Sequence, residues 1–447
     1  MKPKQRYSSY LLASYLLLSL HSYAQNSSLL KLEDAIHLAL QNNQSIKIAK
    51  EKNIQAATNL QEAKNRRLPD FNINGQLLHV NQPLIDLRVK LNNSGSSSGS
   101  SAPDVNQVVL AQANIGLPLF NGNKINYSIQ ANEYLVKAAA LDATANKNEL
   151  ILNTIQAYTN LYKCATSLKL INENKLQASK RLKDIEQLYK NNIVSRNDLL
   201  KAQLQEQQVA LQQLEAASEL ELSKISMNLL LGLASTNPID IDSNFMDQLH
   251  IDQITINSID YWENLVMQER PEILSINNRI AASKKNLQIV KSDNYPSIAL
   301  SGGYIYADIN NFLGISNALN GGIAMRYSIS SLWKGSEKIT QAKSKTMELE
   351  WMKSQLSDQV IIQVNKSYQQ LLVAKQKIDL LKNAIQQVSE NYKIVDSKYK
   401  NNLATVQELL DADVMQFQAK VQYEFAKADA SIAYYRLLQV SNQLKFN

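Results

Sequence analysis

The sequence predicts a mainly α-helical protein that also contains two pairs of β-strands. Residues 123–231 and 336–447 contain neither glycine nor proline. Both residue types interrupt helices, so their absence predicts two very long helical regions. Two other segments alternate apolar and polar residues with a period of two, which is typical of strands. The same order of elements occurs twice along the chain, which indicates an internal duplication.

Each long helical region is interrupted once by a short polar segment. The segments read Lys-Asn-Asn-Ile-Val-Ser and Lys-Asn-Asn-Leu-Ala-Thr and end at Ser195 and Thr405. Asp198 and Glu408 follow three residues later, which is the spacing of a capping box at a helix start. The sequence therefore predicts two helical hairpins: 124–191 turning into 196–232 at a tip about 190–196, and 336–400 turning into 405–445 at a tip about 400–405.

Two further helices are predicted at 30–68 and 260–293, the second interrupted near its start by Pro271. Apolar residues between Leu371 and Tyr399 recur in alternating steps of three and four. This period of about 3.5 residues is typical of helices that supercoil around neighbours. The long helices are therefore expected to form a coiled-coil wall, although an ordinary cytosolic coiled coil has the same periodicity.

The alternating segments place two strands in each half of the chain. Phe71, Ile73 and Leu77 fall on one face of the first strand, with polar residues between them. Strands that are apolar on one face and polar on the other suit a membrane barrel, and a half-buried soluble sheet has the same alternation. Four strands are too few to close a membrane barrel, so either the chain oligomerises or the sheet is soluble. The expected strands are about 70–80 and 107–119 in the first half, and about 297–307 and 321–330 in the second.

The N-terminus reads as a signal peptide over residues 1–24. Lys2, Lys4 and Arg6 precede an apolar run that is too short to span a bilayer, and small residues lie near Ala24 at the cleavage position. No later segment is apolar over roughly 18 residues, so a membrane crossing would require a closed barrel. Without the three basic residues of the signal, 44 basic residues face 40 acidic ones. That balance does not indicate a nucleic-acid partner.

Matching segments define the duplication. Residues 68–71 (Leu-Pro-Asp-Phe) match 295–298 (Tyr-Pro-Ser-Ile), and residues 189–200 match 399–410. Each half reads helix, strand, loop, strand, long helix, tip and helix, so two copies of one structural unit are expected. The predicted organisation is a signal peptide at 1–24, a first repeat at 25–236, a connector at 237–259 and a second repeat at 260–447.

These features resemble the TolC-like outer-membrane efflux family over nearly all of the mature chain. Each motif is weak alone, and their order and spacing across two repeats carry the resemblance. One departure concerns the second tip, where Ala404 stands in place of an arginine that helps to latch the tunnel of relatives shut. The motifs are Leu-Glu-Asp-Ala-Ile at 32–36, Leu-Gln-Asn-Asn at 40–43, Leu-Pro at 68–69, Arg-Pro-Glu-Ile at 270–273, Tyr-Pro-Ser at 295–297 and Leu-Leu-Asp-Ala at 409–412.

The resemblance implies a mainly helical fold in which long coiled-coil helices form an α-helical barrel. It also implies that four strands per chain join a trimeric, twelve-stranded β-barrel in the outer membrane of a Gram-negative bacterium, with a long periplasmic extension. The implied partners are a homotrimer of this chain, a periplasmic adaptor (membrane fusion) protein, an inner-membrane pump and outer-membrane lipid, with no nucleic acid. No cofactor is implied.

The implied function is that of a channel subunit in a tripartite efflux or type I secretion system. Such a subunit is a passive exit duct for small molecules or secreted protein. The alternative is an exported periplasmic coiled-coil protein, structural or adhesin-like, without a pore. The three histidines of the mature chain lie far apart and Cys164 is the single cysteine. This pattern predicts no catalytic, cofactor-binding or metal site, so an enzyme is not expected.

The candidate functional residues lie at the two tips. Glu408 and Asp411 are three residues apart and share a helix face. The resemblance matches them to the acidic pore constriction of the family, where a trimer would form two rings of carboxylates that favour cations. A solvated helix face is the alternative. Asp198 and Arg196 at the other tip are candidate gating contacts, and a solvated face is the alternative for them too.

Overall fold

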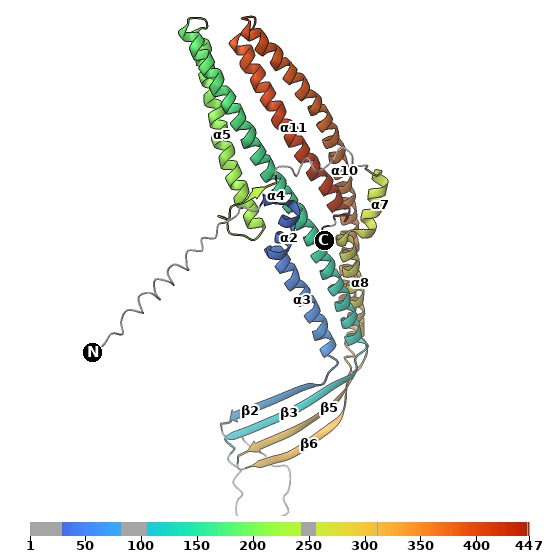
Figure 1. Ribbon diagram of the computed structural model, residues 1–447. Coiled ribbons are helices and arrows are strands. Elements are labelled where there is room, and N and C mark those ends of the chain that lie inside the picture. The colour runs from blue at the N-terminus through green and yellow to red at the C-terminus, as the bar shows by residue number, and fades with distance from the viewer. Residues whose placement is uncertain (1–28, 82–104, 243–255, 311, 445, 447) are drawn as a thin grey trace, which may run out of the picture. The chain divides into compact units, whose positions relative to one another are not determined.

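A computed structural model describes residues 29–81, 105–242, 256–310, 312–444 and 446. The predicted signal peptide at 1–24 lies outside the described residues, and so does much of the predicted connector at 237–259 (Figure 1). The chain forms two compact units, each built from separated segments. Unit 1 comprises residues from 1–47, 146–263 and 362–447, and unit 2 comprises residues from 48–145 and 264–361.

Each unit takes segments from both sequence repeats, so the repeats at 25–236 and 260–447 are not separate compact bodies. Two uninterrupted helices explain this division. Helix α4, Lys124–Lys190, and helix α10, Ser336–Lys400, each begin in unit 2 and end in unit 1. Their 67 and 65 residues confirm the very long helices predicted from the absence of glycine and proline.

Unit 2 contains one antiparallel sheet of four strands in the order β2-β3-β5-β6 (Figure 1). The first three strands confirm the predicted strands at 70–80, 107–119 and 297–307. Within the described residues, β2 and β6 have no neighbour on their outer side, so the sheet has two open edges. The strands span Asp70–His79 (β2), Gln107–Phe120 (β3), Ser297–Ile309 (β5) and Leu313–Arg326 (β6).

The predicted fourth strand at 321–330 was wrong in its bounds, because β6 begins at Leu313 and ends at Arg326. The segment 310–320 was expected to be a loop, but most of it pairs with β5. A register irregularity between Ile305 and Ala307 and a left-handed backbone at Asn317 (φ 59°) interrupt the alternation there. That irregularity hid the strand from a reading of period two.

Cross-strand pairing divides the sheet into an apolar face and a polar face. Because successive side chains of a strand point to opposite sides, each row of paired residues shares one face. One such row is Ile73, Ala113, Tyr304 and Leu319, and the next is Asn72, Asn114, Gly303 and Asn320. The apolar face carries Phe71, Ile73, Leu77, Val109, Ile115, Leu117, Ile298, Leu300, Tyr304, Tyr306, Leu319, Ile323 and Met325. Toward the strand ends that join the helices, the polar face carries Asp70, Asn72, Asn74, Gln76, Gln112, Asn114, Ser297, Ser301, Asn320 and Arg326. Toward the far ends of the strands the division is incomplete: this face also carries Leu78, Val108, Leu110, Ile305 and Ile309, and the apolar face carries Asp308.

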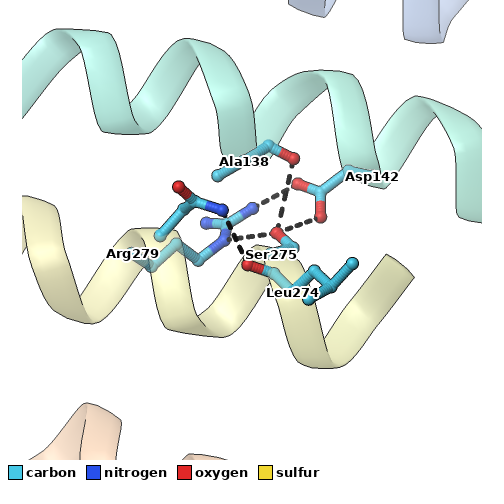
Figure 2. A network of polar contacts seen from close by, with 6 residues as sticks. Ala138, Asp142, Leu274, Ser275 and Arg279 are labelled. Atoms are coloured by element: carbon cyan, nitrogen blue, oxygen red, sulfur yellow. Dashed lines mark hydrogen bonds and ion pairs between the residues drawn. The ribbon is translucent and has the colours of Figure 1, made fainter. Parts of the chain in front are cut away.

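A polar network joins two helices of unit 2 (Figure 2). Ser275 lies on α8, Pro271–Ser292, and its hydroxyl donates to Asp142 Oδ1 of α4 at 2.6 Å. The guanidinium of Arg279, one turn further along α8, pairs with Asp142 Oδ2. Ser275 is buried, so its two acceptors on α4, the carboxylate and the carbonyl of Ala138, satisfy a hydroxyl that burial alone would disfavour.

Unit 1 is held together by an apolar core. The core lies between four helices, which are α2 (Leu32–Asn42), α4, α5 (Arg196–Leu230) and α11 (Val406–Val440). Its largest side chains include Ile36, Ile155 and Tyr158, all 1% exposed or less. The Tyr158 hydroxyl donates to the carbonyl of Leu30 at 2.8 Å. Leu30 belongs to the short strand β1, Leu29–Leu30, which pairs with β4, Asp240–Ile241, from the connector.

Two of the predicted helices are each divided in two. The helix expected at 30–68 breaks at Asn43 into α2 and α3, Gln44–Asn65, because the Asn43 side chain accepts from the Ser45 amide. The helix expected at 260–293 breaks before Pro271 into α7, Ile259–Glu269, and α8. Pro271 lacks an amide hydrogen, and it takes the first position of the new helix. Among the described residues, no helix is long and apolar enough to cross a bilayer.

Candidate functional site at the helical tips

Both tips turn through an asparagine in the left-handed conformation. Asn192 has φ 56° and Asn402 has φ 58°. After each asparagine, the next amide reaches back to close the helix end: Ile193 N to Leu188 O at 2.9 Å, and Leu403 N to Lys398 O at 2.8 Å. This is the Schellman pattern, in which glycine is commonest and asparagine is tolerated. The two repeats therefore build the same turn.

Both outgoing helices begin with the predicted capping box. The Ser195 hydroxyl accepts from the Asp198 amide, and the Thr405 hydroxyl accepts from the Glu408 amide, each at 3.2 Å. Each acidic side chain accepts in return from the amide of the cap residue, at 3.3 Å for Asp198 and 2.7 Å for Glu408. The hydrogen bond from the Thr405 amide lowers the pKa of Glu408.

Glu408 and Asp411 lie together on the exposed face of α11, whereas Leu409 and Leu410 between them are buried. Asp411 accepts from Gln407 Nε2 at 2.9 Å. Neither carboxylate pairs with a cation in the described part of the chain. The pair therefore presents two negative charges to the surroundings of one copy. Their role as a constriction stays a prediction.

The two tips enclose a cleft of about 640 Å³ within unit 1. Asp198 lines this cleft, and so do Val194 and Tyr399 from the two different hairpins. Arg196 is exposed and does not line it. The gating role predicted for Asp198 and Arg196 stays a prediction, because Asp198 hydrogen-bonds to Ser195 of its own hairpin.

A largely buried ion cluster, whose Arg181 and Lys400 also line the cleft, ties the two hairpins together. Arg181 of α4 donates to the Tyr392 hydroxyl at 3.0 Å and to Asp396 Oδ1 at 3.4 Å, both on α10. Its Nε lies 3.5 Å from Asp413 Oδ2 on α11, an ion pair without a hydrogen bond. Lys400 Nζ contacts the second oxygen of Asp396 at 2.6 Å. The side chains of Arg181, Asp396 and Asp413 are 15–19% exposed.

The two carboxylates of this cluster differ in their electrostatics. Burial raises the pKa of Asp413 above its ordinary value, and the nearby Arg181 offsets this only in part. Burial acts in the same direction on Asp396. The hydrogen bond and charge of Lys400, together with Arg181, nevertheless hold the pKa of Asp396 below its ordinary value. Asp413 therefore carries the more costly buried charge of the two.

This cluster was missed at the level of sequence. One available signal was Asp396, which follows Tyr392 of the apolar seam by one helical turn and so shares its face. Arg181 gave no signal, because 215 residues separate it from Asp396. Charged residues near an apolar seam are ordinary on long helices, so only the packing of the hairpins identifies the ones that pair.

The comparisons with known proteins agree with the fold. The family model of the outer membrane efflux protein matches residues 35–233 and 262–443, which are most of the chain and follow the two repeats. No curated protein sequence is significantly similar to the chain. The alternative of a coiled-coil protein without a pore finds no support in these matches.

Solved structures similar to the chain include two outer-membrane channels and an outer-membrane protein. CmeC of Campylobacter jejuni aligns with a TM-score of 0.75 at 18% identity, over 92% of this chain and 86% of that one. VceC of Vibrio cholerae aligns with a TM-score of 0.75 at 16% identity, over 92% and 95%. The open state of MtrE of Neisseria gonorrhoeae aligns with a TM-score of 0.73 at 16% identity, over 93% and 90%. These structures share the fold of the chain, and the family model that matches most of its length shows that the chain is an outer-membrane efflux protein and belongs to the outer membrane efflux protein family.

Proposed function

We propose that the chain is one of three identical subunits of a passive exit duct that works with a periplasmic adaptor and an inner-membrane pump. The open sheet carries this proposal. Its apolar face is exposed along the edge strands, with Ile73 at 74% and Leu319 at 83%. Lipid covers an apolar face at no cost, but unpaired strand edges cost several kcal/mol per buried backbone group in a bilayer. Neighbouring copies remove those edges by continuing the sheet into a closed barrel.

The helices support the same assembly. Apolar residues recur along α5 at a coiled-coil spacing, on the face opposite the buried Ala202, Val209 and Met227. Within the described part of one copy, these residues form an exposed apolar seam that lacks a partner, and Leu214 is 70% exposed. A seam of this kind is stabilised by burial against another helix. The stripe consists of Leu200, Leu204, Leu211, Leu214, Leu222, Ile225 and Leu229.

The tip carboxylates would set the ion preference of the duct. In a trimer, Glu408 and Asp411 supply six negative charges around one opening. Such rings attract cations and are blocked by divalent ions that neutralise them. Glu408 also caps α11, so a test must remove its charge and keep its hydrogen-bonding side chain.

Conductance in planar bilayers tests this function. The wild-type protein is expected to form cation-preferring channels that divalent ions block from the side of the tips. The double variant Glu408→Gln, Asp411→Asn is expected to weaken both the block and the preference, because the amides are neutral and can still accept hydrogen bonds. Asp379→Asn removes an exposed carboxylate in the body of α10, outside the tips and the cleft, and is the control.

Two results would count against the proposal at different levels. Absence of any conductance from folded wild-type protein would refute the duct. Channels whose selectivity and divalent block are the same in the double variant would retain the duct and assign Glu408 and Asp411 to a solvated helix face.

A further inference from the structure

The two open edges of the sheet are complementary in direction. The strands alternate in direction from β2 to β6, so β6 runs opposite to β2. When β6 of one copy meets β2 of a second copy, the new pair is antiparallel like the other pairs of the sheet. This strand pair also extends the apolar and the polar face from one copy to the next, provided that apolar-face residues of β6 stand opposite apolar-face residues of β2.

The two edge strands carry residues of opposite charge at the ends where they join the helices. Asp70 is the first residue of β2 and Arg326 is the last residue of β6, and both are exposed on the polar face. Within the described residues, the Arg326 side chain has no acceptor, and Asp70 accepts only from Asn72 Nδ2 at 3.1 Å. Three strand spacings separate the two edges within one copy, about 14 Å. Asp70 and Arg326 therefore have no means of pairing within one chain.

The tilt of barrel strands limits the register between copies. Four strand spacings lead from β2 of one copy to β2 of the next, about 19 Å. A tilt of about 40° shifts the register by about 16 Å over that span, or about five residues. The shift must be even, because an odd shift would exchange the polar and apolar faces. Shifts of four or six residues remain.

The paired residues Asp70, Gly116, Ser301 and Gly322 form one row across the sheet. Shifts between copies are counted from this row, so that a shift of zero would set Gly322 opposite Asp70 of the next copy. A shift of four places Gly322 opposite Asn74 of the next copy and Arg326 opposite its Asp70. All ten residues of β2 then face β6. A shift of six leaves Asp70 beyond the end of β6. Shifts of four and six residues in the other direction leave four and six of the ten β2 residues without a partner in β6.

We propose that β6 of one copy pairs with β2 of a second copy in the register that sets Arg326 opposite Asp70. In this strand pair between copies, here called the seam, Arg326 and Asp70 form an ion pair. This proposal rests on the proposed trimeric duct. The same register sets Met325 opposite Phe71 and Ile323 opposite Ile73 on the apolar face. Directly opposed residues of this kind, and opposite charges, stabilise antiparallel pairs.

Cysteine cross-linking reads the register directly. In a Cys164→Ala background, the variant Ala324→Cys, Asn72→Cys places the two thiols opposite each other across the seam. The matched control, Ala324→Cys, Asn74→Cys, is displaced by one pleat and corresponds to the shift of six. All three positions are exposed on the polar face. Mild oxidation is expected to link the first variant into covalent trimers and to link the control poorly.

Charge reversal tests the ion pair. Asp70→Arg and Arg326→Asp are each expected to lower the temperature at which the trimer dissociates in detergent, because like charges then oppose each other. The double variant, Asp70→Arg with Arg326→Asp, restores the attraction and is expected to recover most of that loss. Since the two residues lie on opposite edges of one sheet, recovery reports a contact between copies.

The outcomes separate this proposal from the proposed duct. A wild-type protein that is monomeric in detergent overturns the duct and the seam together. A wild-type trimer in which the Asn74 variant cross-links better than the Asn72 variant overturns the register alone. A wild-type trimer whose double reversal is no more stable than the single ones overturns the ion pair.

Discussion

At the scale of single residues, Arg181 links the two helical hairpins near their tips through contacts with α10 and α11. Its guanidinium is the nearest cation to Asp413, whose carboxylate is buried between helices. Arg181→Ala is expected to destabilise unit 1 by about 3 kcal/mol, because removing one member of a buried ion pair leaves an uncompensated charge. Thermal unfolding followed by circular dichroism measures this loss.

Two further variants make the Arg181 prediction specific. Arg181→Lys retains the charge without the planar fork that reaches three partners, so an intermediate loss is expected. Lys183→Ala removes an exposed cation from the same stretch of α4 and is expected to change stability by less than about 0.5 kcal/mol. Equal losses for Lys183→Ala and Arg181→Ala would refute the special role of the cluster.

The two carboxylates of the cluster predict opposite pH dependences. The raised pKa of Asp413 means that its contribution is largest in acid and is lost as the pH rises through that pKa. The lowered pKa of Asp396 means that its contribution is present above its ordinary pKa, about 3.9, and is lost as the pH falls through the lowered value.

Asn variants isolate these contributions. Between about pH 3 and pH 7, Asp413→Asn is expected to gain stability relative to the wild type as the pH rises, and Asp396→Asn to lose it. The unfolding temperature of each variant, measured against the wild type at each pH, gives the sign. The same sign for both variants would contradict the assignment.

At the scale of elements, each of the four junctions between strand and helix exposes a large apolar residue. These are Leu68, Phe120, Tyr295 and Trp333, and Trp333 on the short helix α9, Ser331–Lys334, is 63% exposed. Aromatic residues of this kind gather where a membrane barrel meets the headgroups. Trp333 is therefore expected to lie at the lipid interface.

Fluorescence quenching by brominated lipids tests the position of Trp333. The variant Trp262→Phe, Trp351→Phe leaves Trp333 as the single tryptophan and is expected to be quenched in proteoliposomes. The control variant retains only Trp351, which is 70% exposed and lies 15 residues into α10, about 22 Å along that helix. It is expected to escape lipid quenching. Equal quenching of the two would place the boundary elsewhere.

At the scale of the whole molecule, the stripe on α5 predicts how copies associate. Leu211→Glu together with Leu214→Glu puts two charges into the seam, where burial of each leucine contributes about 1.5–3 kcal/mol. The trimer is expected to dissociate in mild detergent, as measured by light scattering. Leu211→Met with Leu214→Met keeps the seam apolar and is expected to remain trimeric. A trimer that survives both glutamates would show that the stripe lies outside the interface.

Most elements of this fold could be predicted from the sequence because their signals are local. Helix α4 follows from the absence of glycine and proline, and the tips follow from Asn192 and Asn402 with capping residues just beyond them. The bounds of β6 could not be predicted, because an extra residue near Asn317, between the pairs Ile305–Ala318 and Ala307–Ile315, interrupts its alternation. Asn43 was missed as a break because its side chain caps α3 within an otherwise helical pattern.

The helices, three of the four strands, the duplication and the capped tips could all be derived from the order of residues alone. The helices, strands and tips depend on backbone preferences within a few residues, and the duplication depends on matches between distant segments of the sequence. Two features became visible only in the folded chain: each compact unit combines both repeats, and Arg181 contacts Asp396 and Asp413. Arg181 lies more than two hundred positions from both aspartates in the sequence. The energy of these ion pairs depends on how deeply the charges are buried, which a local sequence pattern does not indicate.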